Sequence, residues 1–155
     1  MDLVIVELDG QRYGLRADAV REVVRAVTIT TLPNAPVVVE GIINVRGAVV
    51  AVLDLRRRFE LPAQPLDPSE YFVLATAGNR YVALRVDRAT ELIAVNPAEI
   101  DRAEPLLSRS RYIAGVAKLA DGLVLIHDLA TFLSAAEAAA VDQALAGHER
   151  AGAEG

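Results

Sequence analysis

The 155-residue chain contains no cysteine and no tryptophan, and aromatic residues make up only 5% of it. The lack of cysteine excludes disulfides, thiolate metal sites and a cysteine nucleophile, and it is compatible with a reducing compartment. Acidic residues outnumber basic ones by 21 to 16, so the basic and aromatic side chains that hold nucleic acids are scarce. We therefore expect no binding to nucleic acid.

Long apolar runs are absent as well, because no segment approaches the roughly 18 consecutive apolar residues of a membrane-spanning helix. The N-terminus carries Asp2 where a signal peptide has a basic region. We expect a protein that stays in the cytoplasm and does not insert into a membrane. The abundant residues are aliphatic, and the hydrophobic content of 53% favours β-structure around a well-filled core.

Candidates for catalysis are few. The two histidines, His127 and His148, have no partner at the spacing of metal ligands, so we expect no metal site. His127 lies in a predicted strand and should face opposite to Ile126, as an outward-facing or hydrogen-bonded structural residue. Phosphate-binding glycine patterns are also missing, and Ser108 and Ser110 fit an exposed loop. We expect neither a cofactor nor enzyme activity.

The two halves of the chain follow the same pattern. A predicted hairpin opens each half, one over residues 4–15 with a turn at Asp9-Gly10 and one over 71–86 with a turn at Gly78-Asn79. Corresponding residues lie 69 positions apart: Leu15, Asp18 and Glu22 match Leu84, Asp87 and Glu91. One inserted residue also lets Tyr13 match Tyr81.

Each half is also predicted to close with a hairpin, over residues 41–55 with a turn at Gly47-Ala48 and over 115–129. Here corresponding residues lie 74 positions apart: Gly41 matches Gly115, and Asp54 matches Asp128. Both aspartates stand where a strand ends and a helical turn begins, which suits an N-cap. A duplicated pair fits acid–base chemistry poorly, because that chemistry requires carboxylates in different environments.

The prolines of residues 60–70 oppose regular structure and mark a linker between the halves. Two repeats are too few for a solenoid, so we predict two packed barrels. The first comprises about residues 1–60, completed by strands from the rest of the chain, and the second about residues 71–133.

Helices are predicted at two places. Asn96 followed by Pro97 indicates an N-cap and one helical turn. Ser134 and Glu137 form a capping box before an alanine run. They predict a helix over residues 135–146, followed by a flexible tail over residues 147–155.

An exposed arginine is expected in the first closing hairpin. Strand alternation sends Ile43 and Val45 to one face and Asn44 and Arg46 to the other, beside the predicted turn. Arginine is frequent among the residues that anchor protein interfaces, although a solubilising or ion-paired surface residue is the alternative. The residues alone therefore predict a β-domain that acts as a binding module.

Residues 32–36 (LPNAP) and 41–56 (GIINVRGAVVAVLDLR) closely resemble the signature of CheW-like domains, and the resemblance extends from about residue 2 to 135. It implies a mainly β domain over residues 1–135, with two five-stranded barrels of the Src-homology 3 (SH3) type that share a hydrophobic core, followed by the C-terminal helix. The β-branched residues 37–39 replace a more polar segment of the family, which bears on partner choice.

The resemblance also implies a function. Free-standing members of the family bind the cytoplasmic tip of methyl-accepting chemoreceptors and the regulatory domain of the CheA-type histidine kinase. The chain ends soon after the resemblance does, so it is expected to be a free cytoplasmic adaptor, recruited to receptor arrays in chemotaxis signalling.

Individual residues take their expected roles from the same motif. Asn44, Arg46 and Gly47 match the residues associated with receptor engagement and kinase control, whereas Asp54 and Arg56 match a structural strand end. The kinase side falls on strands of the first barrel. Two alternatives stay open: a small β-barrel module for another ligand or nucleic acid, and a hydrolase that uses Asp54 or Asp128.

Overall fold

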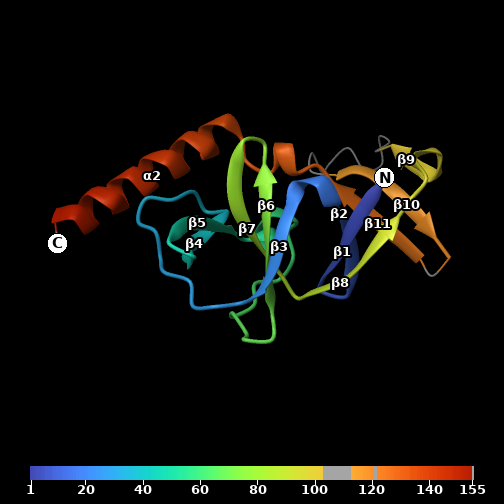
Figure 1. The fold of residues 1–155 in the computed structure, drawn as a ribbon, viewed down its shortest axis with the longest axis horizontal. Helices are drawn as coiled ribbons and strands as arrows, with labels where there is room; N and C mark the ends of the chain where they lie inside the picture. The colour runs from blue at the N-terminus through green and yellow to red at the C-terminus, as the bar shows by residue number, and fades with distance from the viewer. Residues whose placement is uncertain (103–112, 121, 155) are drawn as a thin grey trace.

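The computed structural model describes residues 1–102, 113–120 and 122–154. They form two β-sheets and a long C-terminal helix, α2, which lies beside the smaller sheet (Figure 1). The mainly β fold is therefore confirmed. The predicted loop with Ser108 and Ser110 lies outside the described residues.

The first sheet has six strands in the order β8-β1-β2-β11-β10-β9. Their bounds are β1 (Asp2–Leu8), β2 (Gln11–Arg16), β8 (Arg88–Ala94), β9 (Ile100–Arg102), β10 (Ile113–Leu119) and β11 (Gly122–His127). The second sheet has five strands in the order β3-β6-β7-β5-β4. Their bounds are β3 (Val20–Arg25), β4 (Val39–Val45), β5 (Ala48–Leu53), β6 (Tyr71–Ala77) and β7 (Arg80–Val86).

Short helices connect several strands: η1 (Ala17–Ala19), α1 (Leu55–Arg58), η2 (Pro97–Glu99) and η4 (Leu129–Thr131). The N-cap predicted before η2 is confirmed, because the Asn96 side chain accepts a hydrogen bond from the Ala98 N–H at 3.0 Å. Residues 61–67 form neither a helix nor a strand, as the prolines of the linker predicted.

Each sheet combines strands from both halves of the chain. The opening hairpin β1-β2 lies between β8 and β11, and the opening hairpin β6-β7 lies between β3 and β5. Parallel pairing of β2 with β11 and of β5 with β7 joins the halves (Figure 1). Once equivalent strands are matched, β3-β6-β7-β5-β4 has the same order as β8-β1-β2-β11-β10, which confirms the duplication.

The first barrel is completed by strands from the rest of the chain, β6 and β7, as expected, but β1 and β2 do not belong to it, and the second barrel is not confined to residues 71–133. Each half instead gives its opening hairpin to the sheet of the other half. Hairpins with two-residue turns are local and can be predicted from sequence. Which sheet a hairpin joins is decided by long-range pairing on both of its sides, β1 with β8 and β2 with β11 for the first hairpin, and such pairing has no local signature.

Strand register shows that the spacing of 69 holds throughout the opening hairpins. Val6 pairs with Tyr13 in the first hairpin, and Ala75 pairs with Val82 in the second. Tyr13 therefore occupies the place of Val82, and the predicted match with Tyr81 through an inserted residue is wrong. Burial agrees, because Tyr13 is 6% exposed whereas Tyr81 is 40% exposed.

Gly41 and Gly115 occupy equivalent places, each next to a register shift in its closing hairpin. A Cβ atom would lie 2.2 Å from the Thr30 carbonyl oxygen at Gly41, and 2.8 Å from the Asp101 carbonyl oxygen at Gly115. Thr30 and Asp101 belong to the segments that pair with β4 and β10 and so close the two barrels. The larger sheet has a sixth strand because its closing segment forms β9.

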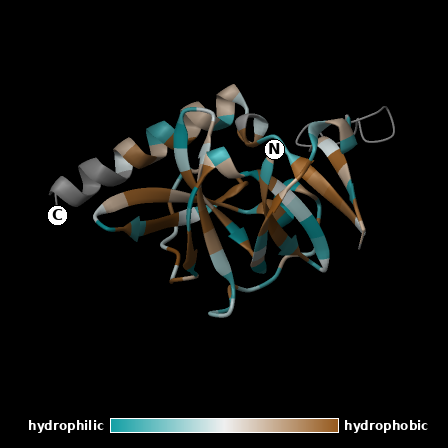
Figure 2. Ribbon diagram, turned by 45° about the vertical axis from the view of Figure 1, so that its right-hand side comes forward, coloured by the Kyte–Doolittle hydropathy of each residue, from teal (hydrophilic) through white to brown (hydrophobic). Residues whose placement is uncertain are grey.

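The hydrophobic core lies mainly where the sheets meet, as Figure 2 shows by the apolar stretches along the central strands. Its largest cluster contains buried residues from both sheets, among them Val6, Leu8, Tyr13, Leu15, Leu53, Val73 and Leu84. A smaller cluster around Ile5 and Val124 lies within one sheet, and another around Val52 and Phe72 lies within the other. The shared core is confirmed.

His127 lies within this shared core and is buried. Its ring stacks on Phe59 at a centroid distance of 4.3 Å and is tilted against Tyr13 at 4.7 Å. The expectation of an outward-facing histidine is wrong. Both faces of β11 are covered, since Ile126 is buried as well, so alternation does not separate exposed from buried positions there.

The helix α2 (Ala135–Glu154) begins at the predicted capping box. The Glu137 N–H donates to the Ser134 hydroxyl, and the Ser134 N–H donates to the Glu137 carboxylate. Two residues of α2, Val141 and Ala144, are buried. Val141 belongs to the shared core, and Ala144 packs with Leu32, before β4, and with Ile42 on β4. Within the described part of the chain, no helix is long and apolar enough to cross a membrane.

The helix continues beyond its predicted end at residue 146, to Glu154, whereas the flexibility of residues 147–155 stays a prediction. A single glycine such as Gly147 costs a helix only about 1 kcal/mol relative to alanine. The residues that follow include Glu149, Arg150 and Ala151, which favour helix. One glycine is therefore too weak a signal to end it.

We expect Gly41→Ala to lower the free energy of unfolding by about 3 kcal/mol or more, because the new methyl group would displace backbone that closes a barrel. Gly147→Ala is the matched control. Among the described residues, nothing beyond its own stretch of helix lies within 4 Å of its added Cβ, and the change should raise the free energy of unfolding by up to about 1 kcal/mol. Urea denaturation measures both. A Gly41→Ala protein as stable as the wild type would contradict the close approach.

Candidate functional site

Arg46 and Gly47 form the two-residue turn between β4 and β5. Their φ angles of 49° and 88° are positive, as a type I′ hairpin turn requires. The Asn44 side chain accepts a hydrogen bond from the Gly47 N–H at 2.8 Å. The three residues expected to bind partners therefore form one unit, in which Asn44 and Gly47 hold the turn. The turn lies one residue before the predicted Gly47-Ala48, because Val45 pairs with Ala48.

The Arg46 side chain is exposed and also ion-paired. Its Nη1 donates to Glu22 Oε1 at 3.0 Å, and its Nη2 donates to Glu22 Oε2. The side chain of Arg46 is 70% exposed and that of Glu22 is 34% exposed. The hydrogen bond from Arg46 lowers the pKa of Glu22 below its usual range. The ion pair connects β3 and the β4-β5 hairpin, which stand at opposite edges of the sheet.

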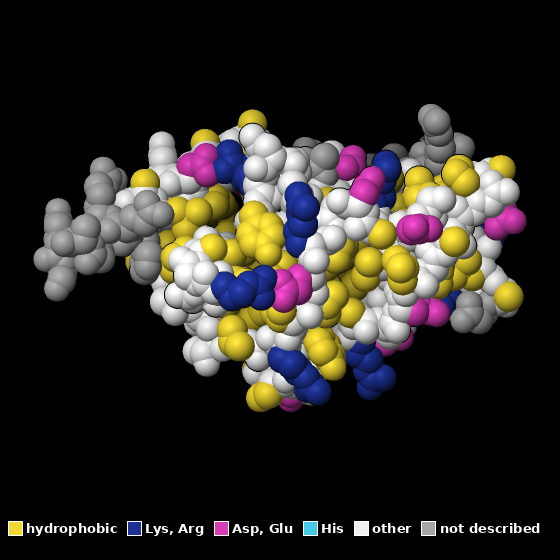
Figure 3. All heavy atoms as spheres, in the orientation of Figure 1, with side chains coloured by type: hydrophobic (Ala, Val, Ile, Leu, Met, Phe, Trp, Pro, Cys, Tyr) yellow, Lys and Arg dark blue, Asp and Glu magenta, His cyan; other side chains and the backbone are white. Residues whose placement is uncertain are grey.

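Apolar side chains accompany this charged pair. Val49 lies opposite Asn44 in the hairpin and is exposed. Tyr81, also exposed, is close enough to Arg46 to raise the pKa of its guanidinium slightly, although the hydrogen bond to Glu22 is the main cause of that increase. In Figure 3, basic and acidic side chains likewise lie next to apolar ones on the visible face. An arginine beside exposed apolar side chains suits a protein partner.

The six-stranded sheet contains the hairpin equivalent to β4-β5, which is formed by β10 and β11. Leu119 pairs with Gly122 at its end, as Val45 pairs with Ala48 in the first. Ala120 therefore occupies the place of Arg46. The second hairpin closes without an arginine in its turn, so the fold does not require one there.

The glutamate, in contrast, is present in both barrels. Glu22 pairs with Leu74, and its counterpart Glu91 pairs with Ile5. The two glutamates lie 69 positions apart, and so do their strand partners. Glu91 is approached at 4.0 Å by Arg12, which lies on β2. In the six-stranded sheet the glutamate is thus approached by an arginine two strands away, whereas in the five-stranded sheet it is bound by an exposed arginine in a turn.

Asp54 acts as the predicted N-cap, because its Oδ1 accepts a hydrogen bond from the Arg57 N–H at 3.1 Å. Asp128 precedes η4, and its carbonyl accepts hydrogen bonds from the N–H and the hydroxyl of Thr131. Capping by the Asp128 side chain stays a prediction. Within the described ranges, no three His, Asp or Glu side chains gather into a possible metal site.

Arg56 is 4% exposed and connects the two barrels. Its Nη2 donates to both carboxylate oxygens of Asp87, at 2.9 and 2.8 Å, and its Nη1 donates to the Pro62 carbonyl. Asp87 also accepts from the N–H of Asp9, in the turn of the opening hairpin. Arg56 thus ties α1 of one barrel to the β1-β2 turn of the other.

A second buried ion-pair network was not identified from the sequence. Arg85 donates to Glu70 at 3.0 Å and to both carboxylate oxygens of Glu40 at 3.0 Å, and its Nη2 also donates to the Gln64 carbonyl at 2.7 Å. Burial raises the pKa of Glu40, while Arg85 opposes this increase. The available signal was an arginine inside the apolar strand 80–86.

Two closed barrels that exchange their opening hairpins around a shared core, with an exposed Asn-Val-Arg-Gly turn at one end, define this chain as a CheW-like domain. Residues 2–137 match the CheW-like domain family, and the chain belongs to it. The resemblance seen in the sequence is confirmed.

Individual relatives agree with this assignment. The chain is 25% identical over 149 residues to the chemotaxis protein CheW of Klebsiella aerogenes, covering 95% of this chain and 90% of the relative. It is 27% identical over 141 residues to the chemotaxis protein CheW of Treponema pallidum, covering 87% and 83%. The crystal structure of the scaffolding protein TtCheW from Thermoanaerobacter tengcongensis is similar, with a TM-score of 0.80 and 28% identity over 88% of this chain and 94% of that one.

We expect Asp87→Asn to lower the free energy of unfolding by about 3 kcal/mol, because it removes the main counter-charge of the buried Arg56. The matched variant Glu22→Gln removes a carboxylate from an exposed pair and should leave thermal unfolding nearly unchanged. Calorimetry of both variants measures the difference. Equal losses of stability would show that the Arg46–Glu22 pair supports the fold as much as the buried pair does.

Proposed function

We propose that this chain is a non-catalytic adaptor that couples chemoreceptors to a CheA-type histidine kinase in chemotaxis signal transduction. Its membership of the CheW-like family supports this, as do relatives named chemotaxis proteins and a solved relative described as a scaffolding protein. The proposed place of action is the cytoplasm, at membrane-associated receptor arrays. Its partners are the kinase and the cytoplasmic tip of the receptors.

The observation that carries the proposal is the difference between the two closing hairpins. The first has Arg46 in its turn and the second has Ala120, yet both turns join equivalent strand pairs. Because the hairpin with Ala120 forms without an arginine, Arg46 is not needed to form its own hairpin and can serve another purpose. Recognition of a partner fits an exposed guanidinium held in place by Glu22.

The geometry of the pair suits reversible recognition. Glu22 holds the guanidinium in one position, so little side-chain freedom is lost when a partner binds. The exposed donors of Arg46 can then bind a carboxylate or a carbonyl of the receptor tip. Contacts of this size give about micromolar affinity between isolated proteins. An array that holds many copies together raises the effective concentration and makes such weak contacts sufficient.

The kinase contact is proposed on strands within residues 1–60. In the structure, β1 and β2 belong to one sheet and β3, β4 and β5 to the other. A kinase domain that touches this part of the chain can therefore contact strands of both sheets.

We expect Arg46→Ala to weaken receptor binding or kinase coupling by about ten- to a hundredfold, because hot-spot arginines contribute on that scale. Its melting temperature should stay within about 2 °C of the wild type, since the lost ion pair is exposed. Arg88→Ala, which changes an exposed arginine on β8, is the matched control and should leave coupling unchanged. Kinase activity reconstituted with receptor-containing membranes, CheA and each variant measures the effect.

Two results would count against the role of Arg46. If Arg46→Ala melts far earlier than the wild type, the arginine is a structural residue. If the variant is stable and couples normally, recognition depends on other residues.

A further inference from the structure

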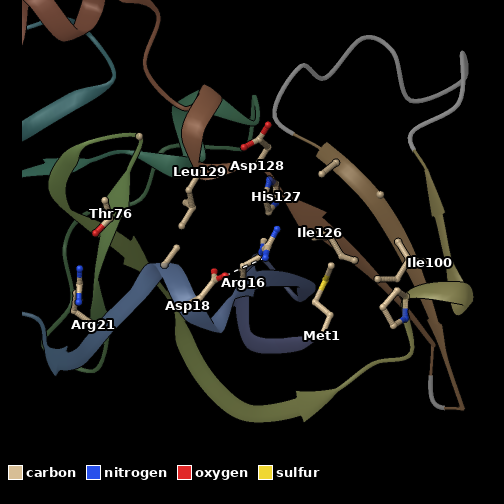
Figure 4. A pocket seen from close by; sticks show the side chains of 15 residues that line it. Met1, Arg16, Asp18, Arg21, Thr76, Ile100, Ile126, His127, Asp128 and Leu129 are labelled. Atoms are coloured by element: carbon tan, nitrogen blue, oxygen red, sulfur yellow. Dashed lines mark hydrogen bonds and ion pairs between the residues drawn. The ribbon is translucent and has the colours of Figure 1, made fainter.

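A groove of about 770 Å³ lies between the two barrels and contains Arg16, Asp18 and Arg21 together with Met1, Ala114 and Leu129. Figure 4 shows Arg16 and Asp18 joined near its centre, with Met1 and Ile126 to one side and Thr76 to the other. The proposed function assigns no role to this groove.

The repeat relates this groove to the buried network around Arg85. Arg16 pairs with Leu3, and Arg85 pairs with Phe72, so Arg85 is the counterpart of Arg16, 69 positions later. The same spacing relates Asp18 to Asp87. Each barrel therefore has an arginine and an aspartate at equivalent places.

In the five-stranded sheet, both of these residues are satisfied within the chain. Arg85 is held by Glu40, Glu70 and the Gln64 carbonyl. Asp87 is held by Arg56. The Gln64 carbonyl belongs to the linker, which is neither helix nor strand there, so an irregular segment of chain lies against Arg85.

At the positions equivalent to these partners, the sequence of the groove-lining half has other residues. Ala114 is the residue at the register shift in β10, where β4 has Glu40. Met1 stands 69 positions before Glu70, and Ala130 stands 74 positions after Arg56. The two glutamates that hold Arg85 and the arginine that holds Asp87 are thus replaced by residues with uncharged side chains.

Arg16 and Asp18 instead pair with each other, at 3.0 Å. Their side chains are 58% and 70% exposed, and an ion pair this exposed adds little stability. A new partner for Arg16 can therefore replace Asp18 at little cost. The apolar walls of the groove, which include Ile126 and Leu129, offer contacts to the chain that carries such a partner.

We propose that this groove is a docking site for an acidic segment of a protein partner, whose carboxylate binds Arg16 as Glu40 and Glu70 bind Arg85. The internal repeat supports the choice of ligand, because it shows which groups an arginine at this place binds when the chain provides them itself. The inference rests on the proposed adaptor function, which supplies the protein partners.

The test is to supply the missing carboxylate within the chain. Ala114→Glu places a glutamate where Glu40 stands in the related barrel, so the new carboxylate should bind Arg16. The affinity of the chain for one of its two partners, the kinase or the receptor, should then fall by about tenfold. Ala114→Gln is the matched control, with the same size and no charge, and should bind within about twofold of the wild type. Arg16→Ala should reproduce the loss caused by Ala114→Glu.

The measurement is the affinity of the full-length variants for two purified probes, the CheA kinase and a cytoplasmic receptor fragment, each titrated separately. Thermal unfolding is recorded in parallel, and Ala114→Glu should be at least as stable as the wild type. The proposal is overturned if Ala114→Glu binds both probes normally. It is also overturned if Ala114→Gln loses as much affinity as Ala114→Glu, because filling of space would then explain the loss.

Arg46→Ala in the same assay separates this inference from the proposed function. If Arg46→Ala weakens binding and Ala114→Glu does not, only the assignment of the groove fails. If the wild-type chain binds neither probe, the adaptor function fails and the groove assignment fails with it.

Discussion

Four strand pairs hold the two halves of this chain together: the antiparallel pairs β1 with β8 and β3 with β6, and the parallel pairs β2 with β11 and β5 with β7. They insert each opening hairpin into the sheet of the other half, so each sheet is completed only by strands from far along the chain. The shared core follows from this exchange, because the hairpins carry residues such as Leu15 and Leu84 into it from both sides. Arg56 reinforces the arrangement by tying α1 to Asp87 and to the turn of the first hairpin.

Much of the local structure could be predicted from the sequence, because hairpin turns, N-caps and the capping box of Ser134 depend on neighbouring residues. The exchange of hairpins could not, since parallel pairing joins segments about 30 or 110 residues apart without a local pattern. Alternation also failed where both faces of a strand are covered, as at His127. The match of Tyr13 with Tyr81 is wrong because the two hairpins are related by a constant spacing, which places Val82 opposite the counterpart of the Tyr13 partner.

The candidate site shows the same division. The exposure of Arg46 could be predicted from strand alternation and a nearby turn, and its importance from the resemblance to CheW-like domains. Its partner Glu22 could not, because the two residues meet only when β3 and β4, the outer strands of one sheet, approach each other to close the barrel. The charges around Arg85 were missed for a related reason, since Glu40, Glu70 and the linker converge there only in the folded chain.

Duplication explains how one small fold can carry both stability and recognition. A glutamate at equivalent places is satisfied by Arg12 on a strand in one barrel and by Arg46 in a turn in the other. An arginine at equivalent places is buried among glutamates in one barrel and exposed beside Asp18 in the other. Exposed ion pairs contribute little to stability, so the copy that holds its charges at the surface can exchange them for those of a partner. The buried Arg85 cannot exchange its partners in this way, because removing a partner from a buried pair would destabilise the fold.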